Sequence, residues 1–365
     1  MVEINQFFKL LKKNNISFFS GVPDSVLKST NSFFDRQKNH YITSNEGLAA
    51  SMCIGYHLST GKLGCLYLQN SGLSNAFNPL ISIAHKKVYS IPLFLLIGWR
   101  GAPGTKDEPQ HQAKGKITKR LLKNLDIKFC ELKNQKDFKT IEKLIRYSKK
   151  NNSPVACLVK KNVLFNKNKN IHQRKYKGII REDFIKIFLK KIKNKTKIVS
   201  TTGFTSRELY QVREKYKLFK GKDFYMVGGM GHASAVALGS SLYEKNDVIC
   251  LDGDGALLMH MGSIPNIGFY GNRNFKHILL NNNCHESVGS QKTNIEKIKL
   301  SKIVLASGYK KFYLIDKTEN IKTSLKKFLN SKGPSFLEVK IKNVSMKNLR
   351  RPDNFKNLKK IFMAN

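Results

Sequence analysis

The chain has 365 residues, of which 41% are hydrophobic and 25% are charged. These proportions are typical of folded globular proteins, and they argue against wholesale disorder and against collagen-like or coiled-coil designs. The 66 lysine and arginine residues outnumber the 25 aspartate and glutamate residues, which gives a formal net charge of +41.

So large a positive charge raises the hypothesis of a nucleic-acid-binding protein. Only 11 of the 66 basic residues are arginine, although arginine is the side chain that best reads base edges. The charges are also unevenly placed, because residues 63–85 contain no lysine, arginine, aspartate or glutamate. We therefore expect no nucleic-acid partner, and we expect the charge to attract small anionic metabolites.

The sequence carries no signal for secretion or membrane insertion. The apolar stretch at residues 91–98 is far too short to span a bilayer, and the N-terminus lacks the apolar core of a signal peptide. The six cysteines form no C-x-x-C pair, which favours reduced, buried thiols over disulfides or a structural zinc site. We expect a cytoplasmic protein with no membrane partner.

The first half of the chain alternates short apolar runs with amphipathic segments. The apolar runs predict strands at residues 16–20, 41–44, 64–68, 92–98, 127–130 and 154–159. Helices are predicted between them, for example at residues 47–58 and 141–148. Continuous apolar strands separated by helices predict an α/β fold with a central, mainly parallel sheet flanked by helices.

Residues 160–177 break this alternation because they are polar, basic and weakly periodic. We interpret them as a linker, which divides the chain into a first domain at 1–160, a linker at 161–178 and a second domain at 179–365. The alternative is a long surface loop within one domain.

The second half repeats the α/β alternation. Strands are predicted at residues 197–201, 224–227, 248–251, 277–280, 311–315 and 335–341. Helices are predicted at residues 182–193, 233–243, 256–269 and 321–329. The sequence thus predicts two α/β domains, each with a functional site at the carboxyl ends of its strands.

Asp254 and Asn282 carry the strongest chemical signal. Asp254 stands in a Gly-Asp-Gly turn after one predicted strand, and Asn282 stands in a run of three asparagines after the next strand. Neighbouring parallel strands bring both side chains to one sheet edge, where their oxygens and the small glycines suit a divalent cation that carries a diphosphate. An EF-hand loop is excluded, because Leu257 stands where that loop needs glycine. A plain glycine turn is the alternative.

Two further segments fit more than one interpretation. Residues 228–233 (Gly-Gly-Met-Gly-His-Ala) form a glycine turn that resembles a weak dinucleotide-binding turn, and Met230 within it also fits a core position. Glu46 follows a predicted strand and opens a predicted helix, where an acidic side chain also stabilises the helix dipole.

Gly-Asp-Gly followed by Asn-Asn at the next strand end resembles the signature of thiamine-diphosphate-dependent enzymes. The resemblance implies thiamine diphosphate and Mg²⁺ as cofactors, a first domain that binds the pyrimidine and a second that binds the diphosphate. The implied metal ligands are Asp254, Asn282 and the carbonyl oxygen of Cys284. The implied cofactor-binding residues are Glu46, Asn70, Ser71, Gly229, Met230, Gly253, Asp254, Gly255, Ala256 and Asn282. Of these, Glu46 would hydrogen-bond the aminopyrimidine ring and Met230 would support the bent cofactor.

Four segments narrow the resemblance to the 2-oxo-acid decarboxylases that act on phosphonopyruvate or sulfopyruvate. These segments are residues 20–25, 69–73, 98–101 and 106–111. The resemblance implies decarboxylation of 3-phosphonopyruvate to phosphonoacetaldehyde and CO₂ in phosphonate biosynthesis, with sulfopyruvate as the alternative substrate. A nicotinamide-dependent oxidoreductase and a basic nucleic-acid-binding protein are more distant alternatives.

The same resemblance implies roles for further side chains and a homo-oligomer. Asp24, Ser25 and Arg100 would bind the anionic substrate, and His111 and His285, with Glu46, would act in proton transfer. The cofactor would lie at an interface between subunits, so the chain would associate with a second copy of itself.

Overall fold

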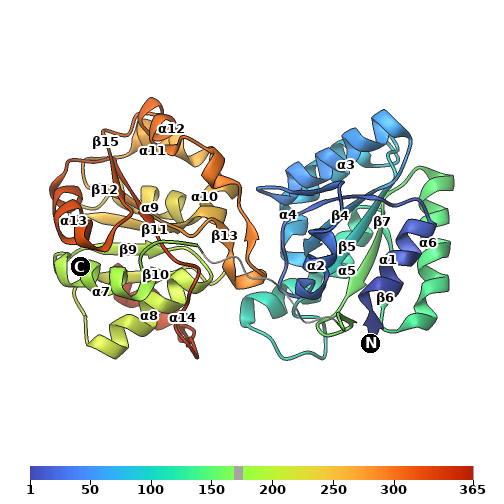
Figure 1. Cartoon of the computed structure of the whole chain (residues 1–365), viewed down its shortest axis with the longest axis horizontal. Helices are drawn as coiled ribbons and strands as arrows, with labels where there is room; N and C mark the ends of the chain where they lie inside the picture. Colours follow the sequence, from blue (N-terminus) through green and yellow to red (C-terminus); the bar gives the residue numbers. More distant parts are fainter. Residues whose placement is uncertain (168–175, 365) are drawn as a thin grey trace. The chain divides into compact units, whose positions relative to one another are not determined.

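The fold is known from a computed structural model, which describes residues 1–167 and 176–364. The chain divides into two compact units, Met1–Gln173 and Arg174–Asn365 (Figure 1). Each unit is built on its own six-stranded sheet with helices on both faces, so the predicted α/β fold is confirmed.

The sheet of the first unit is parallel throughout, with the strand order β3-β2-β4-β5-β7-β6. Its strands are β2 (Phe18–Gly21), β3 (His40–Ile42), β4 (Gly64–Gln69), β5 (Leu93–Gly98), β6 (Lys128–Leu132) and β7 (Val155–Val159). Strands β5 and β7 are buried along their whole length, which explains why the sequence reads there as unbroken apolar runs.

Two hydrophobic cores, one on each face, hold helices to this sheet. Alternate residues of β5 point to opposite faces: Phe94 and Leu96 join the core under α1 and α6, whereas Leu95 and Ile97 join the core under α3, α4 and α5. The helices are α1 (Ile4–Lys13), α2 (Asn31–Phe34), α3 (Glu46–Thr60), α4 (Leu73–Pro79), α5 (Pro109–Asn124) and α6 (Phe138–Asn151). Each face of the sheet therefore carries its own packed layer.

The sheet of the second unit repeats the strand order of the first. It is parallel and runs β10-β9-β11-β12-β16-β15, so in both units the strands follow the same path through the sheet. Its strands are β9 (Lys197–Ser200), β10 (Lys222–Tyr225), β11 (Val248–Gly253), β12 (Phe275–Asn281), β15 (Lys311–Ile315) and β16 (Ser335–Lys340).

Helices again cover both faces of this sheet. One core contains residues of α7, α8 and α13, and the other contains residues of α9, α10, α11 and α12. The helices are α7 (Arg181–Lys191), α8 (Phe204–Tyr216), α9 (Ala233–Ser241), α10 (Asp254–Met259), α11 (Ser263–Tyr270), α12 (Leu300–Ala306), α13 (Ile321–Asn330) and α14 (Phe355–Met363). A short hairpin of β13 (Cys284–His285) and β14 (Gln291–Lys292) follows β12.

The structure differs from the sequence expectation in several places, and it contains α8, α12 and α14, for which no helix was predicted. The single helix expected at 256–269 is two helices, α10 and α11, because Pro265 has no amide hydrogen to donate and is tolerated only in the first turn of a helix. Within the expected linker, Leu164–Phe165 forms strand β8, which pairs with β1 (Val2–Glu3). Residues 168–175 of that linker lie outside the described residues.

The six cysteines are free thiols, as expected, and all except Cys130 are buried. None of the helices in the described part of the chain has the length and apolarity that a bilayer-spanning segment needs.

Candidate active site

In both units, the residues singled out from the sequence follow strands of the six-stranded sheet. In the first unit they follow β2, β3, β4 and β5, in the order Asp24, Glu46, Asn70 and Arg100. In the second unit they follow β10, β11 and β12, in the order Met230, Asp254 and Asn282. Because all strands of a sheet run in one direction, these residues share the carboxyl edge of their sheet, where open α/β folds bind ligands.

Glu46 is the first residue of α3 and is buried, with only 5% of its surface exposed. Its Oε2 accepts a hydrogen bond of 2.8 Å from Asn75 Nδ2 in α4. The carboxyl group also lies over Gly72, where an added β-carbon would stand 2.2 Å from Glu46 Oε1. Burial raises the pKa of Glu46 above its ordinary value, and the Asn75 hydrogen bond opposes that rise only in part. Glu46 is thus a fixed carboxyl group that holds a proton more readily than a surface glutamate.

Asp24 is a second buried carboxyl group in the same unit. Its Oδ2 accepts a hydrogen bond of 3.1 Å from the backbone of Leu27, whereas Oδ1 is buried and meets no hydrogen-bond donor among the described residues. The side chain lies against Gly98, where a β-carbon would stand 1.8 Å from Oδ2. Burial raises the pKa of Asp24 to about 7, despite opposing backbone hydrogen bonds and the charge of Arg100. A carboxyl group of this kind suits proton transfer near neutral pH.

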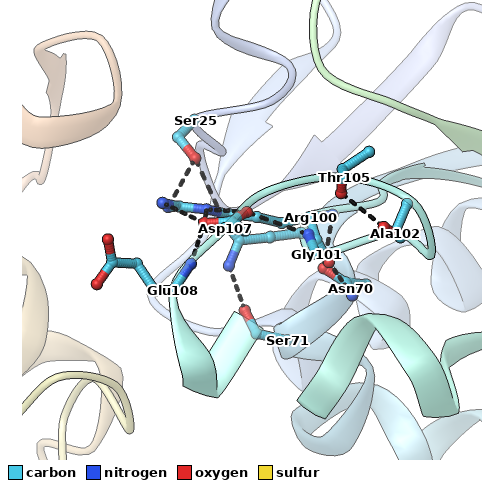
Figure 2. Close-up of polar contacts among 10 residues, drawn as sticks. Ser25, Asn70, Ser71, Arg100, Gly101, Ala102, Thr105, Asp107 and Glu108 are labelled. Carbon is cyan, nitrogen blue, oxygen red and sulfur yellow. Dashed lines mark hydrogen bonds and ion pairs between the residues drawn. The ribbon is translucent and has the colours of Figure 1, made fainter. Parts of the chain in front are cut away.

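Arg100 lies in the loop after β5, held by Asp107 and Ser25 (Figure 2). Its Nε donates to both carboxylate oxygens of Asp107, at 3.1 and 3.3 Å, and its Nη2 donates to Oδ1 at 3.3 Å. Nη1 donates to Ser25 Oγ at 3.3 Å. Each terminal nitrogen keeps one further N–H beyond these bonds, so the guanidinium can still bind an anion in a fixed orientation.

Asn70 is occupied in positioning the Arg100 loop. Its Nδ2 donates to the carbonyl oxygen of Arg100 at 3.0 Å and to Thr118 Oγ1 at 2.9 Å, and its Oδ1 accepts from the Arg100 amide at 3.1 Å. The cofactor contact expected of Asn70 and its neighbour Ser71 stays a prediction, and the hydroxyl of Ser71 accepts a hydrogen bond of 2.7 Å from Gln69.

His111 lies in the first turn of α5, against the same loop. A β-carbon at Gly101 would stand 2.0 Å from the carbonyl oxygen of His111, so only glycine permits this approach. The charge of a protonated His111 contributes to the lowered pKa of Asp107, after the larger effects of Arg100 and a backbone hydrogen bond. The structure thus brings Asp24, Ser25, Arg100 and His111 to one strand edge.

Asp254 begins α10 directly after β11 and is buried. Its Oδ2 accepts a hydrogen bond of 2.6 Å from Thr293 Oγ1, a contact that the sequence analysis did not predict. Burial raises the pKa of Asp254 to about 7. A divalent cation at this carboxyl group would favour its charged form, so the position fits a metal ligand better than a free carboxylate.

The three asparagines differ in their contacts and backbone conformation. Asn281 ends β12 and donates from Nδ2 to Glu338 of β16 at 2.6 Å, which gives it a structural task. Asn283 adopts a positive φ of 58°, a turn conformation that asparagine tolerates. Asn282 Oδ1 accepts a 3.2 Å hydrogen bond from the amide of Cys284 and keeps a second lone pair.

Asn282 contacts a cluster of buried ion pairs through Glu286. Asn282 Nδ2 donates to Glu286 Oε2 at 2.8 Å, and Glu286 pairs with the guanidinium of Arg181. Arg181 Nη1 in turn donates to Glu208 Oε1 at 2.9 Å. The sequence analysis missed this cluster because its members come from α7, α8 and the loop after β12, far apart along the chain.

The predicted glycine turn lies beside the metal-ligand candidates. A β-carbon at Gly255 would stand 2.8 Å from His285 Cε1 and 3.2 Å from Met230 Cε, so these three residues converge. Gly229 and Gly231 have φ values of 63° and 86°, which favour glycine on both sides of Met230. Burial lowers the pKa of His285 to about 4, so at neutral pH its ring is uncharged.

Two matching family models identify the chain's relatives. The thiamine pyrophosphate enzyme N-terminal TPP-binding domain matches residues 4–121, and the C-terminal TPP-binding domain matches residues 199–339. Phosphonopyruvate decarboxylase of Streptomyces viridochromogenes is 32% identical over 356 residues, which cover 92% of this chain and 88% of that protein. The chain belongs to the thiamine pyrophosphate enzymes.

Other members of the family agree with this placement. Phosphonopyruvate decarboxylase of Streptomyces hygroscopicus is 29% identical over 374 residues, covering 96% of this chain and 90% of that protein. Sulfopyruvate decarboxylase subunit beta of Methanocaldococcus jannaschii is 38% identical over 117 residues, which cover 32% of this chain and 60% of that subunit. The expected enzyme class is confirmed: the protein is a thiamine-diphosphate-dependent carboxy-lyase.

The residues present fit the cofactor of this family. Asp254 and Asn282 offer the hard oxygen ligands that Mg²⁺ prefers. A β-carbon at Gly253 would meet only Thr201, at 3.8 Å, so the backbone there is open to a diphosphate. Glu46 offers a buried carboxyl group that can share a proton with a ring nitrogen. The supporting contacts of Asn75 and Thr293 had no local sequence signal, because they join residues 29 and 39 positions apart. Asp107 and Glu286 lie only seven and four residues from Arg100 and Asn282, but the sequence analysis assigned them no supporting role.

Proposed function

We propose that the protein decarboxylates 3-phosphonopyruvate to phosphonoacetaldehyde and CO₂, a reaction of phosphonate biosynthesis. Two relatives that bear the name phosphonopyruvate decarboxylase align with at least 92% of this chain. Within the site, the proposal rests on Arg100, which Asp107 holds in place while two of its N–H groups remain for an anionic tail. Ser25 Oγ accepts from Nη1 of Arg100 and donates to Gln69 Oε1 at 3.4 Å, so it helps to hold the guanidinium in place.

In this proposal the second unit holds the charged end of the cofactor. Asp254, Asn282 and the carbonyl oxygen of Cys284 are the ligands that we assign to Mg²⁺, and Met230 with the glycines around it supports the cofactor. When bound, thiamine diphosphate supplies the electron sink that accepts the electron pair released as CO₂ leaves. The first unit supplies Glu46, whose buried carboxyl group holds a proton for the pyrimidine ring.

Proton transfer to the product needs a group that is still protonated near neutral pH. Asp24 meets this requirement, because burial raises its pKa to about 7 and its Oδ1 meets no donor in the described structure. His111 at the start of α5 is the second candidate of the first unit. Burial lowers the pKa of His285 to about 4, so its ring is neutral at neutral pH and its role in this proposal is to hydrogen-bond the reacting groups.

Sulfopyruvate is the alternative substrate, because sulfopyruvate decarboxylase subunit beta is also a relative. A phosphonate can carry a second negative charge that a sulfonate lacks, so a positive pocket with several donors favours the phosphonate. Asp107 already neutralises part of the Arg100 charge, and the remaining preference therefore depends on the unused N–H groups and on Ser25.

The deciding experiment measures kcat/KM for phosphonopyruvate, sulfopyruvate and pyruvate with the wild type and the Arg100→Ala variant. We expect the order phosphonopyruvate, sulfopyruvate, pyruvate, and a loss of roughly tenfold to a hundredfold for phosphonopyruvate in the variant. Pyruvate should lose much less. A wild-type preference for sulfopyruvate would reverse the substrate assignment, and equal losses on pyruvate and phosphonopyruvate would remove Arg100 from tail recognition.

We also infer that the chain self-associates and acts in the cytoplasm. Large apolar side chains stand exposed within each unit, such as Leu58 of α3 and Phe269 of α11, which are 69% and 81% exposed. The six free thiols support a reducing compartment. Light scattering of the purified protein with and without cofactor tests the self-association.

A further inference from the structure

Glu208, Arg181 and Glu286 form a cluster of buried charges that the stability of the fold does not by itself explain. We propose that Arg181 and Glu286 are positioning residues, which fix the amide of Asn282 so that its oxygen faces the Mg²⁺ site. This inference rests on the proposed metal ligands Asp254 and Asn282.

Burying the three charged side chains of this cluster costs free energy. The side chains of Arg181, Glu208 and Glu286 are 4%, 1% and 10% exposed, so three charges have been removed from water. Burying an ion pair rarely stabilises a fold more than apolar side chains of the same volume would. The cluster contains one basic and two acidic side chains, so its formal charges do not cancel. A role in holding another group accounts for it better than stability does.

The contact with Asn282 has the direction that a metal ligand needs. An asparagine amide has an oxygen end and a nitrogen end of nearly equal size, and only the oxygen binds a cation. A carboxylate can only accept, so Glu286 Oε2 selects the nitrogen end at 2.8 Å. The amide of Cys284 donates to Oδ1 at 3.2 Å and fixes the other end. Together the two contacts exclude the flipped amide, which would present N–H groups to the cation.

Arg181 acts on Asn282 through Glu286. Its Nη2 donates to Glu286 Oε2, the same oxygen that accepts from Asn282, and its Nη1 donates to Glu208. Glu208 is itself held by the backbone amide of Met346 at 3.1 Å. Arg181 therefore holds Glu286 in place, because a mobile partner would not select the amide orientation.

The test uses metal affinity, a property that a merely structural role would not change. The probe is Mn²⁺, titrated into the purified full-length protein with excess thiamine diphosphate and followed by electron paramagnetic resonance. We expect Glu286→Gln to weaken Mn²⁺ binding by roughly tenfold to a hundredfold, the usual effect of losing a partner of a metal ligand. Glu286→Asp keeps the charge but shortens the side chain, and we expect a similar loss because the reach to Asn282 is gone.

The matched control is Asp223→Asn. Asp223 pairs with Arg213 in another buried ion pair of the same unit, and in the described part of the chain its carboxylate is bonded to Arg213 and Tyr225. This variant also removes one carboxylate from a buried arginine, so it should lower the melting temperature of the cofactor-free protein while Mn²⁺ affinity stays unchanged. If Asp223→Asn weakens Mn²⁺ binding as much as Glu286→Gln, a general loss of stability explains the effect and the proposal fails.

A double-mutant cycle with Asn282→Ala separates this inference from the proposed metal site. If Glu286 acts through Asn282, Glu286→Gln should cause no further loss of Mn²⁺ affinity in the Asn282→Ala background. An equal loss in both backgrounds would overturn the positioning role, as would unchanged affinity in Glu286→Asp. If Asn282→Ala alone leaves Mn²⁺ binding unchanged, it is the metal-ligand assignment that is wrong.

Discussion

Glu46 and Gly72 occupy positions that leave no room for a side chain between them. A β-carbon on Gly72 would stand 2.2 Å from Oε1 of Glu46 and 2.4 Å from its Cδ. Gly72 has a φ of −80°, which any residue adopts, so its absent side chain is the only reason for glycine here. The glycine thus keeps open the space that the Glu46 carboxyl group fills.

We predict that Gly72→Ala displaces Glu46 and lowers kcat at least tenfold. The clash falls on the flexible end of a side chain, so the cost in stability should be about 1–3 kcal/mol, and the protein should still fold. Steady-state kinetics and urea unfolding check the two effects.

Gly55→Ala is the control within the same segment of the chain. Gly55 lies in α3, and a β-carbon there would meet nothing within 4 Å. We expect unchanged activity and a gain in stability of about 0.5–1 kcal/mol, because alanine favours the helix. Loss of activity in both variants would mean that the effect of Gly72→Ala does not pass through Glu46.

Asp24 should make the stability of the protein fall with rising pH. Burial raises its pKa from 3.8 to about 7, so between these values the native state binds a proton that the unfolded state releases. Stability contributed by the neutral carboxyl group is therefore complete below pH 4 and lost progressively up to pH 7.

Asp24→Asn removes this pH dependence. The variant should gain stability relative to the wild type between pH 5 and pH 8, by an amount on the order of 2–3 kcal/mol. Urea unfolding of the cofactor-free proteins at both pH values measures the difference. The same difference at pH 5 and pH 8 would show that Asp24 titrates normally.

Asp254→Ala should abolish retention of Mg²⁺ and thiamine diphosphate while leaving the fold intact. Neutral glycine backbone cannot balance the charge of a diphosphate, so the cofactor depends on the cation that Asp254 binds. Thr293→Val removes only the 2.6 Å hydrogen bond to Asp254, and we expect a loss of cofactor affinity of roughly tenfold. Calorimetric titration and circular dichroism report binding and fold, and full cofactor affinity in Asp254→Ala would contradict the assignment.

Glu46→Gln should still bind the cofactor, because one hydrogen bond among many is changed. Exchange of the C2 proton of the bound cofactor and turnover should both fall steeply, since an amide cannot share a proton with the ring as a carboxyl group does. Nuclear magnetic resonance of quenched samples measures the exchange rate. Near-normal exchange would reduce Glu46 to a residue that stabilises the start of α3.

The sequence predicted the sheets well and the helices less well. Strands such as β5 and β7 are buried on both faces, so their apolar runs stand out from the polar segments beside them. The break between α10 and α11 was missed although Gly262 and Pro265 both mark it, because apolar residues on either side, such as Leu257 and Ile264, fit one helical pattern. Helix α8 was missed because most of its residues are polar or charged.

From the sequence, only site residues that directly follow a predicted strand could be proposed. Asp254 and Asn282 could be found because short turns after neighbouring strands place them together. The contacts that tune them could not, because Thr293 is 39 residues from Asp254 and Arg181 is 105 residues from Glu286. Arg100 shows the same limit: the sequence indicated its positive charge, and only the folded loop shows that Asp107 shares it.

The shared strand order of the two sheets has a consequence for how such a protein can diverge. Both units follow the same path, β3-β2-β4-β5-β7-β6 in one and β10-β9-β11-β12-β16-β15 in the other. The strand scaffold is therefore held in common, and the residues assigned to the site lie just beyond the strands, such as Glu46 in one unit and Asp254 in the other. Substitutions inside the strands mainly affect the stability of the fold, whereas substitutions at those positions change what each unit binds. New specificities can therefore evolve at these positions without a change of either fold.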